Sequence, residues 1–189
     1  MSESSSGRAA SSPSNSAHST GKGATTTVHA KRNPRGIIKP TVPSDLTTIL
    51  AEGLRADDVD ELACWQRTPE QAFADAWQTS RPLIFTIHVD GVPSALFGAA
   101  EVSDSSEGSV WMLGTDRLLV SPRELIVESR LWIQFLAGFF DGLTNWVSAH
   151  NSVSIRWLEA MGFTFPGDVI ISLTGTPFRK FTLCANLSQ

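Results

Sequence analysis

The stretch "NSVSIRWLEAMGF", residues 151–163, decides how the fold of this sequence is interpreted. Asn151 is a good helix N-cap, because its side-chain oxygen can accept a backbone N–H of the first helical turn. Apolar residues then recur at helical spacing and form one wide stripe: Val153, Ile155, Trp157, Leu158 and Met161. Gly162 stands where a helix commonly ends in a left-handed residue, and Phe163 can fold back onto the last turn. The stretch therefore predicts a capped helix that ends at Gly162 with a positive φ.

The chain has 189 residues, of which 41% are hydrophobic, and this suits one domain with a proper core plus an additional segment. Its most apolar run, residues 131–140, is shorter than the roughly 20 residues that a membrane-spanning helix needs. Cys64 and Cys184 lie far apart, and the histidines show no ligand spacing. We therefore expect no membrane span, no disulfide framework and no metal site, and the cysteine usage favours a reducing compartment.

The net charge of −4 is unevenly distributed. Residues 1–43 hold six basic residues and one acidic residue, whereas the remainder holds nine basic and eighteen acidic residues, so a net +5 precedes a net −9. Residues 1–35 are rich in Ser, Gly, Ala and Thr, and we expect them to form a disordered arm before a domain at 36–189. The basic centre of this arm suits an anionic partner, nucleic acid or an acidic protein surface; the alternative is a solvated tail. That centre consists of Lys31, Arg32 and Arg35.

Capping patterns predict where the helices of the first half begin. Ser44 can cap a helix over residues 45–51, and a second helix is expected over residues 57–66. The segment "TPEQ" at residues 68–71 is a stronger signal, because it places Thr at the cap, Pro at the first helical position and Gln in the capping box.

A second capping box, "SPRE" at residues 121–124, predicts a long helix that ends at about Phe140. Its expected apolar stripe consists of Leu125, Glu128, Leu131, Trp132, Phe135, Leu136 and Phe139. Glu128 is the one charged member of this stripe. It is a candidate general base if it is buried without a partner, and otherwise it forms an ion pair or lies at a partly exposed edge.

The strands complete the predicted architecture. Asp90-Gly91 is a two-residue hairpin turn between two strands within residues 82–102. Further strands are expected at residues 37–38, 109–115, 143–149, 163–165 and 177–184. The order is therefore strand, two or three helices, three strands, long helix, strand, helix and two strands. This order predicts an α+β fold in which helices flank a mixed sheet.

This order and the opening stretch resemble the GCN5-related N-acetyltransferase (GNAT) superfamily of acyl-CoA N-acyltransferases. The resemblance spans residues 36–184. It rests most specifically on the spacing of Asn151, Ser154, Trp157-Leu158 and Gly162-Phe163. It implies a GNAT-like domain, and active members of the superfamily use acetyl-CoA.

A closer resemblance is to the internal virion protein A family of short-tailed bacteriophages. It is carried by "SVWMLGTD" at residues 109–116, by Glu128 and Arg130 within one helix, and by the Asn-x-x-Ser-Ile-Arg-Trp-Leu run at residues 151–158. The family is linked to virion assembly or genome delivery, so the resemblance implies a protein of the virion and, during assembly, of the host cytoplasm. The arm is an addition to the family pattern, and we expect its partners to be other virion proteins or packaged DNA.

The cofactor loop departs from the pattern of active acetyltransferases. Active relatives hold the pyrophosphate of coenzyme A with backbone N–H groups of a glycine-rich loop at a helix start. The matching interval at residues 114–124 has no glycine after Gly114, a proline without N–H, and Glu124 at the helix start. Losing two or three charge-assisted hydrogen bonds of about 1.5–3 kcal/mol each would turn micromolar affinity into millimolar or worse. The candidate cofactor-binding residues that remain are Leu113, Gly114, Thr115 and Asn151.

Proton donation to the leaving thiolate is the second deficit. The tyrosine that serves this purpose in relatives falls at Leu158, and the chain contains no tyrosine; general acid catalysis is typically worth about 10²–10⁴-fold. Glu128, Asn151 and Ser154 are candidate catalytic residues, each with a structural role as the alternative. We therefore expect a virion or assembly protein with an acetyltransferase-like fold, no cofactor and no catalysis. The alternative is an active acetyl-CoA-dependent N-acyltransferase with an atypical cofactor loop.

Overall fold

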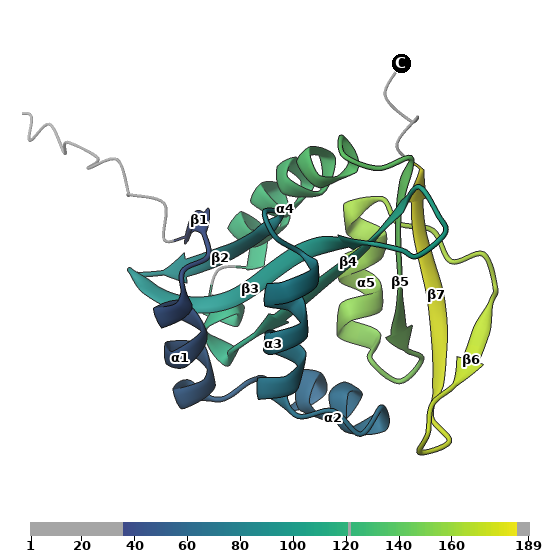
Figure 1. Ribbon diagram of the computed structural model, residues 1–189, viewed down its shortest axis with the longest axis horizontal. Helices are drawn as coiled ribbons and strands as arrows, with labels where there is room; N and C mark the ends of the chain where they lie inside the picture. The colour runs from purple at the N-terminus through teal and green to yellow at the C-terminus, as the bar shows by residue number, and fades with distance from the viewer. Residues whose placement is uncertain (1–35, 121, 185–189) are drawn as a thin grey trace, which may run out of the picture. The chain divides into compact units, whose positions relative to one another are not determined.

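A computed structural model of the protein describes residues 36–120 and 122–184, and for residues 119, 120 and 122–125 it describes the backbone alone. The predicted order of helices and strands is confirmed (Figure 1). The expected arm, with Lys31, Arg32 and Arg35, lies outside the described residues. Within the described residues, no helix has the length and apolar character needed to cross a membrane.

Seven strands form one sheet: β1 (Gly36–Pro40), β2 (Ile84–Val89), β3 (Val92–Glu101), β4 (Glu107–Gly114), β5 (Gly142–Ser148), β6 (Val169–Ile171) and β7 (Pro177–Cys184). The helices are α1 (Pro43–Glu52), α2 (Ala56–Cys64), α3 (Pro69–Thr79), α4 (Pro122–Ala137) and α5 (Ser152–Met161), with a 3₁₀ turn, η1 (Asp116–Val120), before α4. The strand order is β1-β2-β3-β4-β5-β7-β6, and only the β4–β5 pair is parallel among the described strands. The predicted hairpin turn is confirmed, because Asp90 and Gly91 both have positive φ.

Helices cover both faces of the sheet. In Figure 1, α1 and α3 lie in front of β2–β4, and α4 and α5 lie behind the sheet. The larger core joins α4 and α5 to the sheet through buried residues such as Ile133, Leu136 and Leu158. A smaller core joins Ile49 of α1 and Phe73 of α3 to the sheet. Each such side chain contributes about 1.5–3 kcal/mol on full burial, so the two cores hold the helices to the sheet.

The helix predicted from the opening stretch is present as α5. The Asn151 side chain caps it, with Oδ1 accepting the Ser154 N–H at 2.9 Å. Gly162 ends it with φ 98°, and the Phe163 N–H donates to the Leu158 carbonyl at 3.1 Å. The predicted N-cap and the predicted positive φ are both confirmed.

The apolar stripe predicted for the long helix is confirmed only in part: Leu136 is buried and Trp132 packs against the larger core, whereas other members are exposed. Three of its members have more than two-fifths of their surface exposed: Leu131 (59%), Phe135 (45%) and Phe139 (54%). Glu128 is also exposed, whereas the buried face carries Ile133 and Leu136. Because α4 is apolar on two faces, its periodicity does not determine which face meets the sheet. The helix also ends at Ala137, three residues before the predicted end.

Two further boundaries differ from the predictions. Helix α1 begins at Pro43, and its cap position is Val42, whose N–H donates to Asp45 Oδ2 at 3.1 Å. Proline is favoured at the first helical position, so the helix begins earlier than a Ser44 cap would allow. Residues 163–165 form only an isolated bridge, and the short β6 takes the place of the predicted strand.

Of the two predicted capping boxes, at residues 68–71 and 121–124, only the first lies within the described residues. At α3 the predicted box is confirmed, because the Gln71 N–H donates to Thr68 Oγ1 at 3.3 Å and the Thr68 N–H donates to Gln71 Oε1 at 3.0 Å. The box predicted at residues 121–124 rests on Ser121, which lies outside the described residues.

The left-handed backbone at Gly162 gives a stability test. In Gly162→Ala the new Cβ would lie 3.8 Å from Leu183 Cδ1, so the cost arises from the backbone conformation and not from a clash. We expect a loss of about 1–2 kcal/mol in the free energy of unfolding, measured by urea denaturation. Gly36→Ala is the matched control, because a Cβ there meets no atom within 4 Å and its φ is not positive. Equal stability of the two variants would contradict the αL assignment.

Candidate functional site

The candidate site lies where strands β4 and β5 separate. The two strands pair only over Glu107–Ser109 and Gly142–Thr144. Beyond these residues one side chain bridges them: Asn145 Nδ2 donates to the Val110 carbonyl at 2.8 Å, and Asn145 Oδ1 accepts the Trp146 N–H at 2.8 Å. Past Asn145 the facing edges of the strands are open to other groups.

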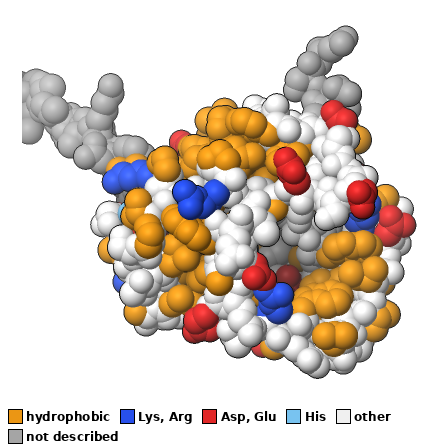
Figure 2. Space-filling view, in the orientation of Figure 1, with side chains coloured by type: hydrophobic (Ala, Val, Ile, Leu, Met, Phe, Trp, Pro, Cys, Tyr) orange, Lys and Arg blue, Asp and Glu red, His pale blue; other side chains and the backbone are white. Residues whose placement is uncertain are grey.

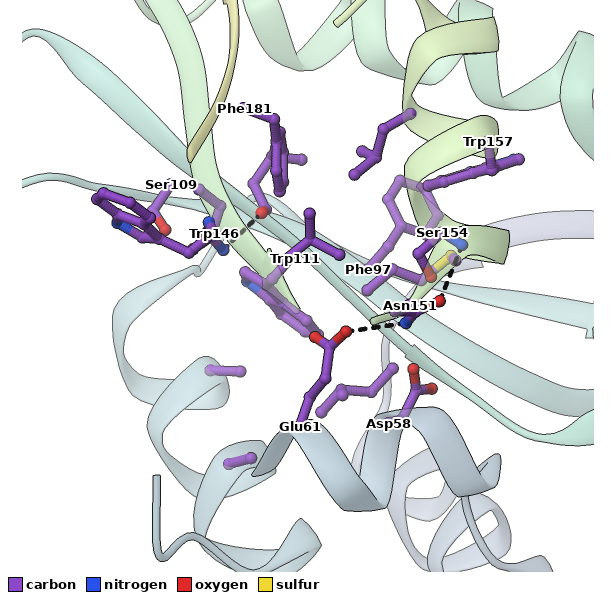
Figure 3. A pocket seen from close by; sticks show the side chains of 18 of the residues that line it. Asp58, Glu61, Phe97, Ser109, Trp111, Trp146, Asn151, Ser154, Trp157 and Phe181 are labelled. Atoms are coloured by element: carbon purple, nitrogen blue, oxygen red, sulfur yellow. Dashed lines mark hydrogen bonds between the residues drawn. The ribbon is translucent and has the colours of Figure 1, made fainter. Parts of the chain in front are cut away.

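A cavity of about 720 Å³ occupies this opening. Many elements contribute to its lining, and those from α2, β4, β5 and α5 include Glu61, Trp111, Trp146, Asn151 and Ser154 (Figure 3). In Figure 2 the surface is hollowed near the centre of the view, and acidic and basic side chains lie at the edge of the hollow. The lining therefore combines aromatic walls with a few polar groups, which is typical of binding sites.

Helix α2 directs two carboxylates into the opening. Asp58 Oδ2 accepts the Gly114 N–H at 2.8 Å, and the Arg55 N–H donates to the Gly114 carbonyl at 2.8 Å. The Arg55 guanidinium also forms a two-pronged ion pair with Asp58, with Nη2 to Oδ1 at 2.8 Å. Burial raises the pKa of the Asp58 carboxyl, and the charge of Arg55 opposes this shift. The end of β4 is thereby bound to α2 through both polar groups of one residue.

Glu61, one turn further along α2, reaches the other side of the opening. Its Oε1 accepts Asn151 Nδ2 at 2.8 Å and the Ser148 N–H at 3.3 Å. Burial raises the pKa of the Glu61 carboxyl, and these two hydrogen bonds act against the shift. Its other oxygen, Oε2, has no hydrogen-bond partner among the described residues. Figure 3 shows the Glu61 carboxylate directed toward Asn151 across the cavity.

The structure brings together some of the residues predicted from the sequence. Asn151 lies in the site and makes both a helix cap and the contact with Glu61. Ser154 lines the cavity, where its N–H is bonded to the Asn151 side chain. Leu113 also lines the cavity. Glu128 is exposed and does not line the cavity, so the interpretation of Glu128 as a buried general base is wrong and the alternative of an exposed edge position holds.

The backbone groups of two predicted cofactor-binding residues are used within the protein. Thr115 is fully buried, and its N–H donates to the Ser94 carbonyl at 2.8 Å. Gly114 is bonded to Asp58 and Arg55, as described above. Leu118 of η1 folds back over this end of the strand, such that a Cβ on Gly114 would lie 2.5 Å from Leu118 Cδ1.

Glu61 and Asp58 were missed at the sequence level. The segment "ADDVDELAC" has four acidic residues within five positions, and the helical pattern alone does not separate Asp58 and Glu61 from the exposed Asp57 and Asp60. Their three-residue spacing places them on one face. Only the position of α2 over the β4–β5 opening distinguishes them.

The raised pKa of Glu61 makes stability depend on pH. The folded protein binds this proton more tightly than the unfolded chain, whose carboxyl has the ordinary pKa of 4.5. The carboxyl therefore stabilises the fold at low pH, and this stabilisation is lost as pH rises through the folded-state pKa. Glu61→Gln cannot ionise but keeps an acceptor for Asn151. We expect its free energy of unfolding, relative to the unsubstituted protein, to rise as the pH increases above the ordinary carboxyl pKa of 4.5.

The matched control for this measurement is Asp60→Asn, which removes one negative charge from an exposed position on the same helix. A relative stability of Glu61→Gln that follows that of Asp60→Asn at every pH would show that burial of Glu61 has no energetic effect.

Comparison with known proteins places this geometry in a known fold. No family model and no curated protein sequence matches the chain. Among solved structures, the ribosomal-protein-S18-alanine N-acetyltransferase of Escherichia coli superposes with a TM-score of 0.56 at 17% identity, over 82% of this chain and 96% of that one. The ribosomal-protein-alanine N-acetyltransferase of Brucella melitensis gives 0.59 at 14%, over 78% and 99%. The spermidine N-acetyltransferase of Vibrio cholerae, solved with CoA and spermine, gives 0.59 at 8%, over 81% and 97%.

At these identities the comparisons establish the fold alone. The sheet with helices on both faces belongs to a fold shared with acetyltransferases. The predicted fold class is confirmed: the described part of the chain is a mixed α+β domain with the GNAT fold.

Proposed function

We propose that the protein is a phage virion or assembly-associated protein that uses the GNAT fold as a binding scaffold and has lost acetyl transfer. The observation that carries this proposal is the hydrogen bonding of Gly114 at the end of β4. Both of its backbone polar groups are bonded to α2, the N–H to Asp58 and the carbonyl to Arg55. The start of the cofactor loop is thus occupied by the protein's own groups.

The first residues of this loop, 114–117, offer few free N–H groups to the pyrophosphate of coenzyme A. A phosphate cradle needs several unpaired N–H groups at one place. Here the N–H groups of Gly114 and Thr115 already have acceptors, and Arg117 N–H donates to Thr115 Oγ1 at 3.3 Å. The Asp58 carboxylate at this position would also repel a pyrophosphate, and Arg55 is paired with that carboxylate.

The position expected for a proton donor supports the same conclusion. Leu158 stands there and is buried with 7% of its surface exposed. A buried leucine supplies no proton, and the sequence contains no tyrosine elsewhere. The general-acid contribution of about 10²–10⁴-fold would therefore be missing.

Several residues that carry the resemblance to internal virion protein A have structural roles. Arg130 Nε and Nη2 donate to the Ala160 carbonyl at 3.0 and 2.8 Å, which ties α4 to the last turn of α5. Asn151 caps α5, and Thr115 is buried beneath η1. Because the residues of this sequence pattern hold helices in place, the pattern supports the role of a scaffold more than that of a catalyst. Lys31, Arg32 and Arg35 remain our proposed attachment to virion proteins or packaged DNA, testable by deleting residues 1–35 and counting the protein in purified virions.

A second candidate function is an active acetyl-CoA-dependent N-acyltransferase. The cavity between β4 and β5 and the raised pKa of Glu61 favour it, since a carboxyl whose pKa lies closer to neutrality is a better general base. In that case Glu61 Oε2 would accept a proton from an ammonium group of the acceptor, and Asn151 would hold the carboxylate in place. The occupied cofactor loop stands against this candidate.

Calorimetric titration of the full-length protein with acetyl-CoA separates the two candidates. We expect a dissociation constant in the millimolar range or no detectable heat, because the loop lacks two or three charge-assisted hydrogen bonds. The Vibrio cholerae spermidine N-acetyltransferase, which was solved with CoA, is the positive control for the assay. A low-micromolar dissociation constant that is lost when residues 114–118 are substituted would refute the proposed loss of function.

A further inference from the structure

We infer that the opening between β4 and β5 is a docking groove for an extended, basic peptide segment of a partner protein. This inference rests on the proposed scaffold role, because it fills with a peptide the space that an acyl-CoA would take in an enzyme. Three features of the described residues support it: an open strand edge, a free carboxylate oxygen, and the lack of an available cation in the lining.

The open strand edge is centred on Met112. Along β4 the polar groups of alternate residues point away from β3, as the Val110 carbonyl and both polar groups of Gly114 do. Met112 lies between them and pairs across the sheet with Phe97 of β3 in the same orientation. Its N–H and carbonyl therefore face the opening, and no described residue bonds to them. One extended residue of a ligand can make both hydrogen bonds, as in β-strand addition.

The length of this open edge is limited on both sides. Asn145 is hydrogen-bonded to the Val110 carbonyl, and Asp58 of α2 is hydrogen-bonded to the Gly114 N–H. The edge therefore accepts a single residue of backbone at Met112, and recognition beyond it must come from side chains. This geometry favours a peptide that crosses the opening over one that lies along the whole strand.

The charge of the groove selects a basic side chain. Glu61 Oε1 accepts hydrogen bonds from Asn151 and Ser148, whereas Oε2 has no partner among the described residues and belongs to a half-buried side chain that lines the cavity. A lysine or arginine side chain in the cavity could donate to this free oxygen. Trp111 and Trp146 line the same cavity and can hold the apolar stem or the charge of such a side chain.

The cations in the lining already have partners. Arg55 is paired with Asp58, and Arg67 is paired with Asp75. Neither is available to neutralise Glu61, so the charge that complements the groove has to come from the ligand. Opposite charges at a docking site give specificity as well as affinity.

The test uses the full-length protein and a blocked hexapeptide of alternating threonine and lysine, titrated by calorimetry at physiological salt. We expect saturable binding that weakens about tenfold or more in Glu61→Gln, and less than about twofold in the matched control Asp60→Asn. Methylating the backbone nitrogens of alternate peptide residues should weaken binding by a similar factor, because the peptide can then no longer donate to the Met112 carbonyl. Unfolding curves of both variants confirm that the fold is retained.

Each contrary outcome has a distinct meaning. Equal weakening by Glu61→Gln and Asp60→Asn would show non-specific attraction to α2 and overturn the docking site. Full binding of the methylated peptide, or equal binding of lysine amide, would overturn a strand-like ligand in favour of a small amine. Absence of peptide binding and of acetyl-CoA binding would overturn the docking site and leave the scaffold role intact. Acetylation of the hexapeptide by acetyl-CoA, abolished in Glu61→Gln, would instead overturn the proposed function.

Discussion

The separation of β4 from β5 is the constraint on which the rest of this structure depends. Two parallel strands that pair over three residues and then diverge leave backbone N–H and carbonyl groups without a strand partner in the interior of the sheet. Buried backbone groups of this kind cost about 1–3 kcal/mol each when they remain unpaired. The protein satisfies most of them with side chains, and the identity of those side chains determines what the opening can bind.

Helix α2 supplies the main part of this compensation. Asp58 takes the N–H at the end of β4, and Glu61 takes the Ser148 N–H of β5, so one helix face spans the opening. Asn145 closes it on the opposite side. In a fold whose solved members include a complex with CoA, these contacts leave a cavity beside the end of β4 and bind both backbone polar groups of Gly114. A scaffold that binds a peptide and an enzyme that has lost its cofactor can therefore share one architecture.

Much of the fold could be predicted from local patterns, because the decisive residues act within one turn of chain. Asn151 and Gly162 fix the ends of α5 through their own backbone and side-chain geometry, and the box at Thr68 acts in the same way. The phase of α4 could not be predicted, since Leu131 and Phe135 make one face as apolar as the face that is buried. The choice between two apolar faces depends on the sheet and not on the helix.

The site was predictable only in part, for a related reason. Asn151 could be found because its helix-capping role is local, whereas Asp58 and Glu61 acquire their roles from strands more than fifty residues away in sequence. The loop sequence indicated an altered cofactor loop, but not that Arg55 and Asp58 bind both backbone groups of Gly114.

The hydrogen-exchange rate of the Gly114 amide, measured by NMR in the free protein, tests this picture most directly. If the N–H is bonded to the buried Asp58 carboxylate, it should exchange as slowly as the neighbouring Thr115 amide, and both signals should stay unchanged when acetyl-CoA is added. Fast exchange at Gly114, as in an open loop, together with saturable shifts of both signals by acetyl-CoA, would contradict it and restore a working cofactor site.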